Sequence, residues 1–262
     1  MPVHKILLKL MRFRLRLFKK GWEGTASGER IYAIGDIHGR ADLFLSLLRA
    51  IKKDSALRGN FSTRIILLGD LIDKGPSSKD VIDLVHHFQH QFEAFVVLTG
   101  NHEEMLVQSA MGNGTVQNLW FENGGLATLK SYGVDAAQIP TLSPVERGKL
   151  IHKAVGKKTL TWLSQLPMSY RSGDYFFCHA GIRPGRALHR QDREDLLWIR
   201  NEFLDSQEHH GAVIVHGHSE GLQVEALRNR INIDTAAYRT GVLTALGLEN
   251  DCRWFLEATA DL

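Results

Sequence analysis

The phrase GDIHG at residues 35–39 returns twice in altered form, as GDLIDKG at residues 69–75 and as GNHE at residues 100–103. Each copy directly follows a short apolar, β-branched run that is typical of a buried strand, at residues 31–34, 64–68 and 94–99. Helices are expected after each phrase, near residues 41–53, 77–90 and 102–111. This alternation of strands and helices predicts an α/β fold with a parallel sheet.

Carboxylate, amide and imidazole side chains come directly after these strands. In open α/β sheets, the loops at the carboxyl ends of the strands line the ligand-binding crevice. Two later strands end in a similar way, in CHAG at residues 178–181 and in HGH at residues 216–218. The strand-end groups are two carboxylates, one amide and three imidazoles: Asp36, His38, Asp70, Asn101, His179 and His218.

This ligand set mixes hard oxygen donors with imidazoles, which suits Mn²⁺, Fe or Zn²⁺ better than Ca²⁺. Six protein ligands are too many for one catalytic ion that must keep positions open for water and substrate. Two metal ions about 4 Å apart would share a carboxylate, polarise a phosphoryl oxygen and hold a bridging hydroxide at neutral pH. The sequence therefore predicts a dinuclear metal site.

Length and composition predict one large domain, because 262 residues with 44% hydrophobic residues can bury a sizeable core. Cys178 and Cys252 are the two cysteines, so we expect a reduced, cytoplasmic protein without a disulfide. Residues 21–262 hold 25 basic and 29 acidic residues, and no basic stripe interleaved with aromatics occurs there. Nucleic-acid binding by this domain is therefore not expected.

Residues 1–20 differ from the rest, with seven Lys or Arg and no acidic residue. On a helix, the basic residues between 5 and 20 fall largely on one face and apolar residues fill the rest. The uncharged runs are too short to cross a bilayer. One interpretation is a helix that lies on an anionic membrane surface, here the inner membrane, or docks on a partner. The other is an extension, over residues 1–29 with a flexible link at 21–29, that packs on its own domain or stays disordered.

Residues 112–170 break the strand–helix rhythm. A helix is expected from Pro144 to Gly156 and another before Pro167, so the segment is interpreted as a helical insertion. This segment either forms one side of the binding site or has a purely structural role. Strands are expected again, partly antiparallel, at residues 174–178, 212–216, 230–234, 241–247 and 253–258.

Between residues 31 and 248 the phrases GDIHG, GDLIDKG, GNHE, CHAG and HGH occur in the order typical of the metallophosphoesterases. The chain resembles in particular the phosphoprotein phosphatase branch, which includes bacterial and lambda-phage protein phosphatases and has diadenosine tetraphosphatases as near relatives. The resemblance implies a four-layer sandwich over residues 30–262, with two mixed β-sheets flanked by helices.

The resemblance also implies a role for each motif residue. Asp36 and His38 would bind the first metal ion, Asn101, His179 and His218 the second, and Asp70 would bridge them. The expected ions are two Mn²⁺, with Fe or Zn²⁺ as alternatives. His102 would protonate the leaving oxygen, and Asp73 would hold its other ring nitrogen. A carboxylate behind the imidazole favours the charged, proton-donating form, which supports this assignment.

Phosphate needs cationic donors, and the family supplies two arginines. Arg200 matches one, whereas the other position holds Lys74, which keeps the charge but loses the bidentate fork. Arg183 is either a helper for phosphate binding or an arginine of a surface loop.

The residues around these cations leave the substrate open. Lys74 followed by Gly-Pro resembles the diadenosine tetraphosphatase branch, whereas Asp73 and the stretch Ile231–Thr235 resemble bacterial protein phosphatases, with Ala236 in place of an expected Gly. Trp120 with the NGG at residues 123–125 is shared by both branches.

Three functions are carried forward. The first is a phosphoprotein phosphatase acting on phospho-Ser, Thr or Tyr through a metal-bridging hydroxide. The alternative is a hydrolase of dinucleoside polyphosphates or polyphosphate. The third is a non-catalytic module anchored to a membrane or partner through residues 5–20. Substrates are accordingly a phosphorylated protein or a phosphorylated small molecule, and Cys178 is expected to be packed and not nucleophilic.

Overall fold

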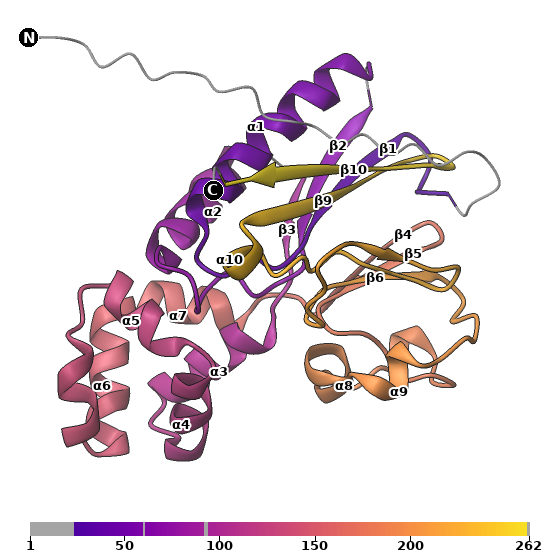
Figure 1. Ribbon diagram of the computed structural model, residues 1–262. Helices are drawn as coiled ribbons and strands as arrows, with labels where there is room; N and C mark the ends of the chain where they lie inside the picture. Colours follow the sequence, from indigo (N-terminus) through magenta and orange to yellow (C-terminus); the bar gives the residue numbers. More distant parts are fainter. Residues whose placement is uncertain (1–23, 60, 92–93, 261–262) are drawn as a thin grey trace, which may run out of the picture.

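Two five-stranded β-sheets form the centre of the protein (Figure 1). The computed structural model describes residues 24–59, 61–91 and 94–260. The predicted helix at residues 5–20 lies outside the described residues. The strands of the first sheet have the order β10-β9-β1-β2-β3, and those of the second the order β4-β5-β6-β8-β7.

The first sheet contains the three strands that precede the repeated phrases. They are β1 (Glu29–Ile34), β2 (Ser62–Leu67) and β3 (Phe95–Val97), connected by the helices α1 (Ala41–Leu57) and α2 (Ser78–Gln91). β2 pairs in parallel with both β1 and β3, which confirms the predicted parallel unit. The sheet as a whole is mixed, because β9 (Val242–Glu249) is antiparallel to β1 and to β10 (Cys252–Thr259).

The second sheet contains the two later strands that end in histidine motifs. These are β5 (Tyr175–Cys178) and β6 (Val213–His216), which pair in parallel, and β6 also pairs in parallel with β8 (Arg230–Asn232). The sequence patterns missed the two antiparallel edge strands, β4 (Ser169–Ser172) and β7 (Glu225–Ala226). Both are short and largely half-buried or exposed, so they lack the apolar run that marks a buried strand.

Side chains that alternate along the strands build three apolar cores. Ile31 and Ala33 of β1 face Tyr175 and Phe177 of β5 between the sheets. Tyr32 and Ile34 point the other way and pack against α1 and α2. On the far side of the second sheet, Phe176 and Cys178 pack against α8 (Arg193–Trp198) and α9 (Asn201–Leu204). The result is the predicted four-layer sandwich of helices, sheet, sheet and helices.

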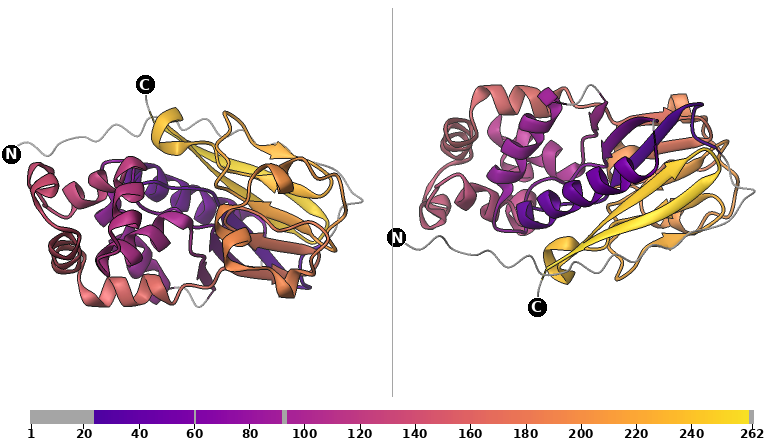
Figure 2. Two further views of the ribbon diagram at one scale, coloured as in Figure 1. Left: turned by 90° about the horizontal axis from the view of Figure 1, so that it is seen from below. Right: turned by 90° about the horizontal axis from the view of Figure 1, so that it is seen from above.

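Helices α3 to α7 form a helical lobe at one end of the first sheet (Figures 1 and 2), and its apolar side chains continue the core under α1 and α2. The helices of the lobe are α3 (Asn101–Ala110), α4 (Gly114–Glu122), α5 (Gly125–Ser131), α6 (Pro144–Val155) and α7 (Lys157–Ser164), with the 3₁₀ turn η1 (Ala136–Thr141) between α5 and α6. Ser143 and Glu146 form a reciprocal capping box at the start of α6, which is the local reason why the predicted helix begins there. Residues 112–170, the segment interpreted as a helical insertion, contain α4 to α7 and η1, and β4 begins near the end of the segment.

Residues 24–28, in the described part of the predicted link, are hydrogen-bonded to the domain. The N–H of Gly24 donates to Asp174, that of Thr25 to the carbonyl of Asn250, and that of Ala26 to Ser172. Two short elements complete the chain, the 3₁₀ turn η2 (Leu188–Arg190) and α10 (Ala237–Thr240). Within the described part of the chain, we find no helix that is both long and apolar enough to span a membrane.

Candidate metal centre

The carboxyl ends of β1, β2, β3, β5 and β6 meet at one place between the two sheets. All six predicted metal ligands lie there, and none of their residues is more than 6% exposed. Two groups of three residues each have ligand atoms that all lie within 4.8 Å of one another. The first group is His38, Asp70 and His102, and the second is Asp70, His179 and His218. Asp70 belongs to both groups, which is the position that a bridging ligand requires.

The Asp70 carboxylate is surrounded by imidazoles. Its Oδ2 lies 3.5 Å from Nε2 of His38 and 3.7 Å from Nε2 of His102, and its Oδ1 lies 3.4 Å from Nε2 of His179. Burial alone would raise the pKa of Asp70, but the imidazoles outweigh it and hold this pKa far below its usual value. Asp70 is therefore an anion at the centre of the site.

Asn101 joins the second group through its side-chain oxygen. Its Oδ1 lies 2.9 Å from Nε2 of His179 and 3.2 Å from Nδ1 of His218. The structure thus brings the amide and both late histidines together, although they come from three different strand ends.

Two of the imidazoles are oriented by backbone carbonyls. Nδ1 of His38 donates to the carbonyl of Ile72 at 2.7 Å, and Nδ1 of His179 donates to that of Leu68 at 3.1 Å. This fixes the tautomer and leaves each Nε2 as the basic nitrogen that faces Asp70. Burial lowers the pKa of both rings and so favours the neutral form that can bind a cation, whereas the Asp70 carboxylate opposes this shift.

Asp36 lies beside the second histidine motif. Its Oδ2 accepts from the N–H of His218 at 3.0 Å, while its Oδ1 is buried without a hydrogen-bond partner among the described residues. A Cβ on Gly217 would stand 1.9 Å from that same oxygen, so the motif needs glycine for the backbone to approach the carboxylate. Burial raises the pKa of Asp36, and the negative charges of Asp234 and Asp70 raise it further.

The structure brings His102 and Asp73 into contact. Nδ1 of His102 lies 2.6 Å from Oδ2 of Asp73, and both residues are buried. Burial lowers the pKa of His102, but the carboxylates of Asp70 and Asp73 outweigh it and the net shift is upward. A raised pKa keeps a proton on the ring near neutrality, as a general acid needs.

Two side chains of the helical insertion hold Asp73, and no sequence pattern predicted this role for them. The indole N–H of Trp120 donates to Oδ2 at 2.7 Å, and the hydroxyl of Thr128 donates to Oδ1 at 2.5 Å. Trp120 belongs to the motif shared by both family branches, and that motif marked the residue as a candidate without indicating its role. The insertion therefore contributes directly to the site.

Glu103 is a further residue for which no role was predicted. Its carboxylate accepts from the backbone N–H groups of Asp70 at 2.8 Å, Leu71 at 2.9 Å and Gly100 at 2.9 Å. Burial raises its pKa to about 7. Glu103 closes the phrase GNHE, and it fixes the loop after β2 against the start of α3.

The predicted phosphate-binding residues have different surroundings. Arg200 follows α8 and is exposed. Burial lowers the pKa of His218 to about 2, and the charges of His179 and Arg200 contribute to this shift. Lys74 lies 3.0 Å from Nε2 of His38 and donates to Glu220 at 2.9 Å. Arg183 instead forms ion pairs with Asp195, at 2.6 Å, and with Glu202.

Several site residues have a left-handed backbone that non-glycine residues rarely adopt. Positive φ angles occur at His38 (43°), Asp70 (47°), Asp73 (73°), Lys74 (61°) and His218 (62°). Each such residue costs about 1–3 kcal/mol and is retained where the surrounding structure requires it, most often at functional sites.

The residues present fit two divalent cations. The donor set is oxygen and imidazole, Asp70 is shared, and both Oδ1 of Asp36 and Nε2 of His218 are buried without a partner among the described residues. Buried polar atoms are normally paired, so these orphaned atoms point to an ion as the missing partner. The two buried clusters are consistent with a dinuclear metal site, and the identity of the metal remains a prediction.

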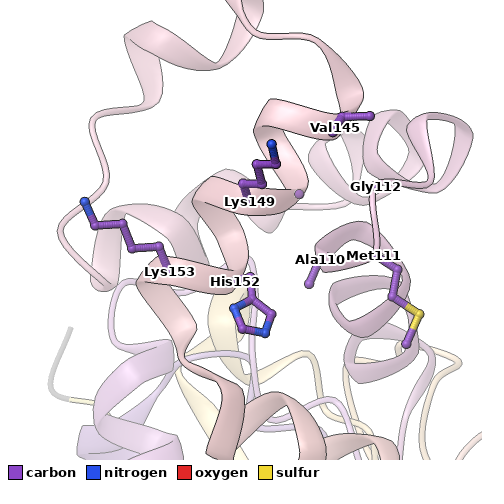
Figure 3. A pocket seen from close by; sticks show the side chains of 8 residues that line it. Ala110, Met111, Gly112, Val145, Lys149, His152 and Lys153 are labelled. Carbon is purple, nitrogen blue, oxygen red and sulfur yellow. The ribbon is translucent and has the colours of Figure 1, made fainter.

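A pocket of about 340 Å³ lies elsewhere, between the end of α3 and α6 (Figure 3). His152, Lys149, Lys153 and Met111 line it. It shares no residue with the two metal clusters, so it takes no part in the chemistry considered below.

Comparison with known proteins agrees with this geometry. Residues 29–243 match the family described as calcineurin-like phosphoesterases. This protein is a calcineurin-like phosphoesterase. The match covers most of the domain and includes every predicted metal ligand. Together with the two buried clusters, it establishes a metal-dependent phosphoesterase.

Several curated relatives of this phosphoesterase carry the names of nucleotide hydrolases. The asymmetrical bis(5'-nucleosyl)-tetraphosphatase PrpE of Oceanobacillus iheyensis is 28% identical over 235 residues, which cover 82% of this chain and 87% of that protein. The symmetrical bis(5'-nucleosyl)-tetraphosphatase of Nitrosococcus oceani is 35% identical over 156 residues, 59% of this chain and 44% of that protein. In the second case, this chain matches less than half of the relative's length.

Solved structures include the same fold in a protein named for a different activity. The cold-active protein-tyrosine phosphatase of a psychrophile Shewanella species has a TM-score of 0.54 and 20% identity, covering 88% of this chain and 76% of that chain. This likeness supports the fold alone. The sequence relatives therefore favour the predicted alternative, nucleotide polyphosphate hydrolysis, over the phosphoprotein phosphatase that was the first expectation.

Proposed function

We propose that this phosphoesterase hydrolyses the phosphoanhydride chain of dinucleoside polyphosphates, with diadenosine tetraphosphate as the substrate to test first. The observation that carries the proposal is the likeness, over 82% of this chain, to a protein named as a bis(5'-nucleosyl)-tetraphosphatase. Lys74 adds support, because its ammonium group lies beside the metal cluster where a phosphate would bind.

The chain's own residues would divide the work as follows. Asp36, His38 and Asp70 would hold one ion, and Asn101, His179 and His218 would hold the other with Asp70 shared. When bound, such ions polarise a phosphoryl oxygen and lower the pKa of water. Arg200 and Lys74 would bind phosphate oxygens, since both are cations close to ligand residues.

His102 would donate a proton to the departing phosphate oxygen. Asp73 accepts from Nδ1 at 2.6 Å, which leaves Nε2 as the donor toward the site. A nucleotide phosphate is a better leaving group than a serine alkoxide, so an anhydride depends less on this proton. Loss of His102 should therefore reduce anhydride hydrolysis less than phosphoserine hydrolysis.

The test gives the Mn²⁺-loaded protein two substrates in parallel. Nucleotide products, ATP with AMP or two ADP, are measured by chromatography for diadenosine tetraphosphate, and orthophosphate release is measured for a phosphopeptide panel. Asp70→Asn provides the blank for each substrate. We expect a clear preference for the dinucleotide, absent in Asp70→Asn. Activity on neither substrate above that blank would contradict an enzymatic function.

A phosphoprotein phosphatase is the second candidate, and a specific observation favours it. The pair of His102 and Asp73 is fully built and held by Trp120 and Thr128, which is the arrangement that a poor alkoxide leaving group requires. In the same experiment, a preference for phosphopeptides would select this function and reject the first.

The membrane-anchored interpretation concerns residues 5–20 and needs a separate experiment. The chain of residues 1–262 and a chain beginning at Gly24, which keeps the contacts of residues 24–28, would be compared by pelleting with anionic liposomes. Selective pelleting of the longer chain would support the anchor, and equal pelleting would remove it.

A further inference from the structure

Glu220 stands at the rim of the site, two residues after the ligand His218, and gathers three side chains. Its Oε1 accepts from Nζ of Lys74 at 2.9 Å and from the hydroxyl of Tyr238 at 3.1 Å. Its Oε2 forms an ion pair with Arg239 at 3.2 Å. These contacts come from the loop after β2, the loop after β6 and helix α10, which are distant in sequence.

This cluster leads from the metal ligands to the surface. Lys74 lies 3.0 Å from Nε2 of His38, and the Tyr238 ring stands edge-on to the His38 ring at 5.6 Å. The Lys74 ammonium also lies over the Tyr238 ring, 4.8 Å from its centroid. Exposure of the side chains rises outward, from 20% for Lys74 through 27% for Glu220 to 57% for Arg239.

We propose that Lys74, Tyr238 and Arg239 form a subsite for the phosphate groups that follow the scissile phosphate in a polyphosphate chain. Glu220 pairs with the two cations and competes with the substrate phosphates, which displace it when they bind. This inference rests on the proposed function, and it names the part of the site that would select polyphosphates over monoesters.

Charge and placement support the subsite. Two cations share one carboxylate, so the cluster carries a net positive charge that suits an anionic chain. Lys74 and Arg239 contact opposite oxygens of that carboxylate, and neighbouring phosphates of one chain could therefore reach both. A monoester bound at the metal ligands has no second phosphate that could reach Arg239.

The test measures competitive inhibition of p-nitrophenyl phosphate hydrolysis by inorganic tripolyphosphate and by orthophosphate, at fixed free Mn²⁺. Arg239→Gln should raise the inhibition constant of tripolyphosphate about three- to fivefold, the effect of one largely exposed ion pair, and leave that of orthophosphate within about twofold. Arg228→Gln is the matched control, since Arg228 is an exposed arginine before β8, at the opposite end of that strand from the site. It should change neither constant.

Glu220→Gln should act in the opposite direction. It removes the carboxylate that competes with phosphate, so tripolyphosphate should inhibit more strongly than in the wild type. Equal effects of Arg239→Gln on both inhibitors, or no effect on either, would overturn the subsite, as would an equal effect of Arg228→Gln. If p-nitrophenyl phosphate is not turned over, calorimetric titration of the same variants with the same two anions gives the same comparison.

These outcomes are separate from the test of the proposed function. A protein that cleaves diadenosine tetraphosphate but shows no selective effect of Arg239→Gln would keep the function and lose the subsite. Selective tripolyphosphate binding without dinucleotide hydrolysis would keep the subsite and reject that substrate.

Discussion

The ligand side and the acid side of the site satisfy their buried polar atoms differently. At the strand ends, Oδ1 of Asp36 and Nε2 of His218 lack a hydrogen-bond partner among the described residues. On the acid side, each oxygen of Asp73 accepts at least one hydrogen bond, from His102, Trp120 and Thr128. Within the described residues, the ligand side therefore leaves buried polar atoms without a partner, whereas both oxygens of Asp73 on the acid side have partners.

This difference indicates what each side is built to bind. A buried polar group without a partner costs about 1–3 kcal/mol, so the ligand side gains when a cation completes it. The acid side already has its hydrogen bonds and needs no ion to hold His102 in place. Changes on the ligand side should therefore alter metal binding and activity together, whereas changes on the acid side should alter activity alone.

The largest effect is expected for Asp70→Asn. Loss of the shared charge should remove most bound metal and reduce hydrolysis by about 10³-fold, the upper range for losing one preorganised electrostatic group. Metal content is measured by mass spectrometry beside the rate. In the wild type, Mn²⁺ at 100 times its dissociation constant should add about 2.7 kcal/mol to the free energy of unfolding. An equal gain in Asp70→Asn would contradict the shared-ligand role.

Asp73→Asn should reduce the rate by about 10²-fold with metal content unchanged, in the lower range for loss of general acid catalysis. The loss should be greater for phenyl phosphate than for p-nitrophenyl phosphate, because the poorer leaving group needs the proton more.

The pH profile gives a second measurement on the same variant. The pKa of His102 is raised in the protein, so the protonated acid is present below this pKa and kcat falls as the pH rises through it. Asp73→Asn removes part of the upward shift and should move the alkaline limb to lower pH. Bound metal ions would offset part of the negative charge of Asp70 and so reduce its contribution to the raised pKa of His102. The contribution of Asp73 would remain. If the alkaline limb did not move, Asp73 would not contribute to the raised pKa of His102.

Trp120→Phe and Thr128→Val should each reduce kcat about tenfold, in the range for groups that orient a site residue, while KM and metal content stay close to wild type. Trp162→Phe is the matched control, because Trp162 is a half-buried tryptophan of the same helical lobe. Should that control lose as much activity as Trp120→Phe, a general effect on the lobe would replace the specific one.

The smallest effects separate two predicted phosphate-binding arginines. Arg200→Gln should raise KM about tenfold, since a charge-assisted hydrogen bond contributes about 1.5–3 kcal/mol. Arg183→Gln should change KM less than about twofold, because Asp195 and Glu202 already occupy its guanidinium. Steady-state kinetics on one substrate measure both. A larger change for Arg183 would restore it as the phosphate-binding helper.

The repeated pattern of strand, glycine and polar residue predicted the parallel strands that the structure shows. It also suggested the proposed ligand residues, and the family motifs added the proposed acid pair. The reason is local. Parallel strands present their carboxyl ends at one edge, so Asp36, Asp70 and Asn101 must meet once β1, β2 and β3 pair. The first substrate expectation did not follow from this geometry, because a shared metal site serves more than one leaving group.

No sequence pattern predicted which side chains surround these ligands, and only the folded structure shows them. Trp120 and Thr128 lie 47 and 55 positions from Asp73 along the chain, and their hydrogen bonds depend on how α4 and α5 pack beside the sheets. The same holds for Glu220, which reaches Lys74 across 146 positions, and for Arg183, which a pattern cannot distinguish from a free cation. Spacing predicts which groups end a strand. Packing between distant segments determines which side chains those groups meet, because such contacts depend on shape and burial that no local pattern records.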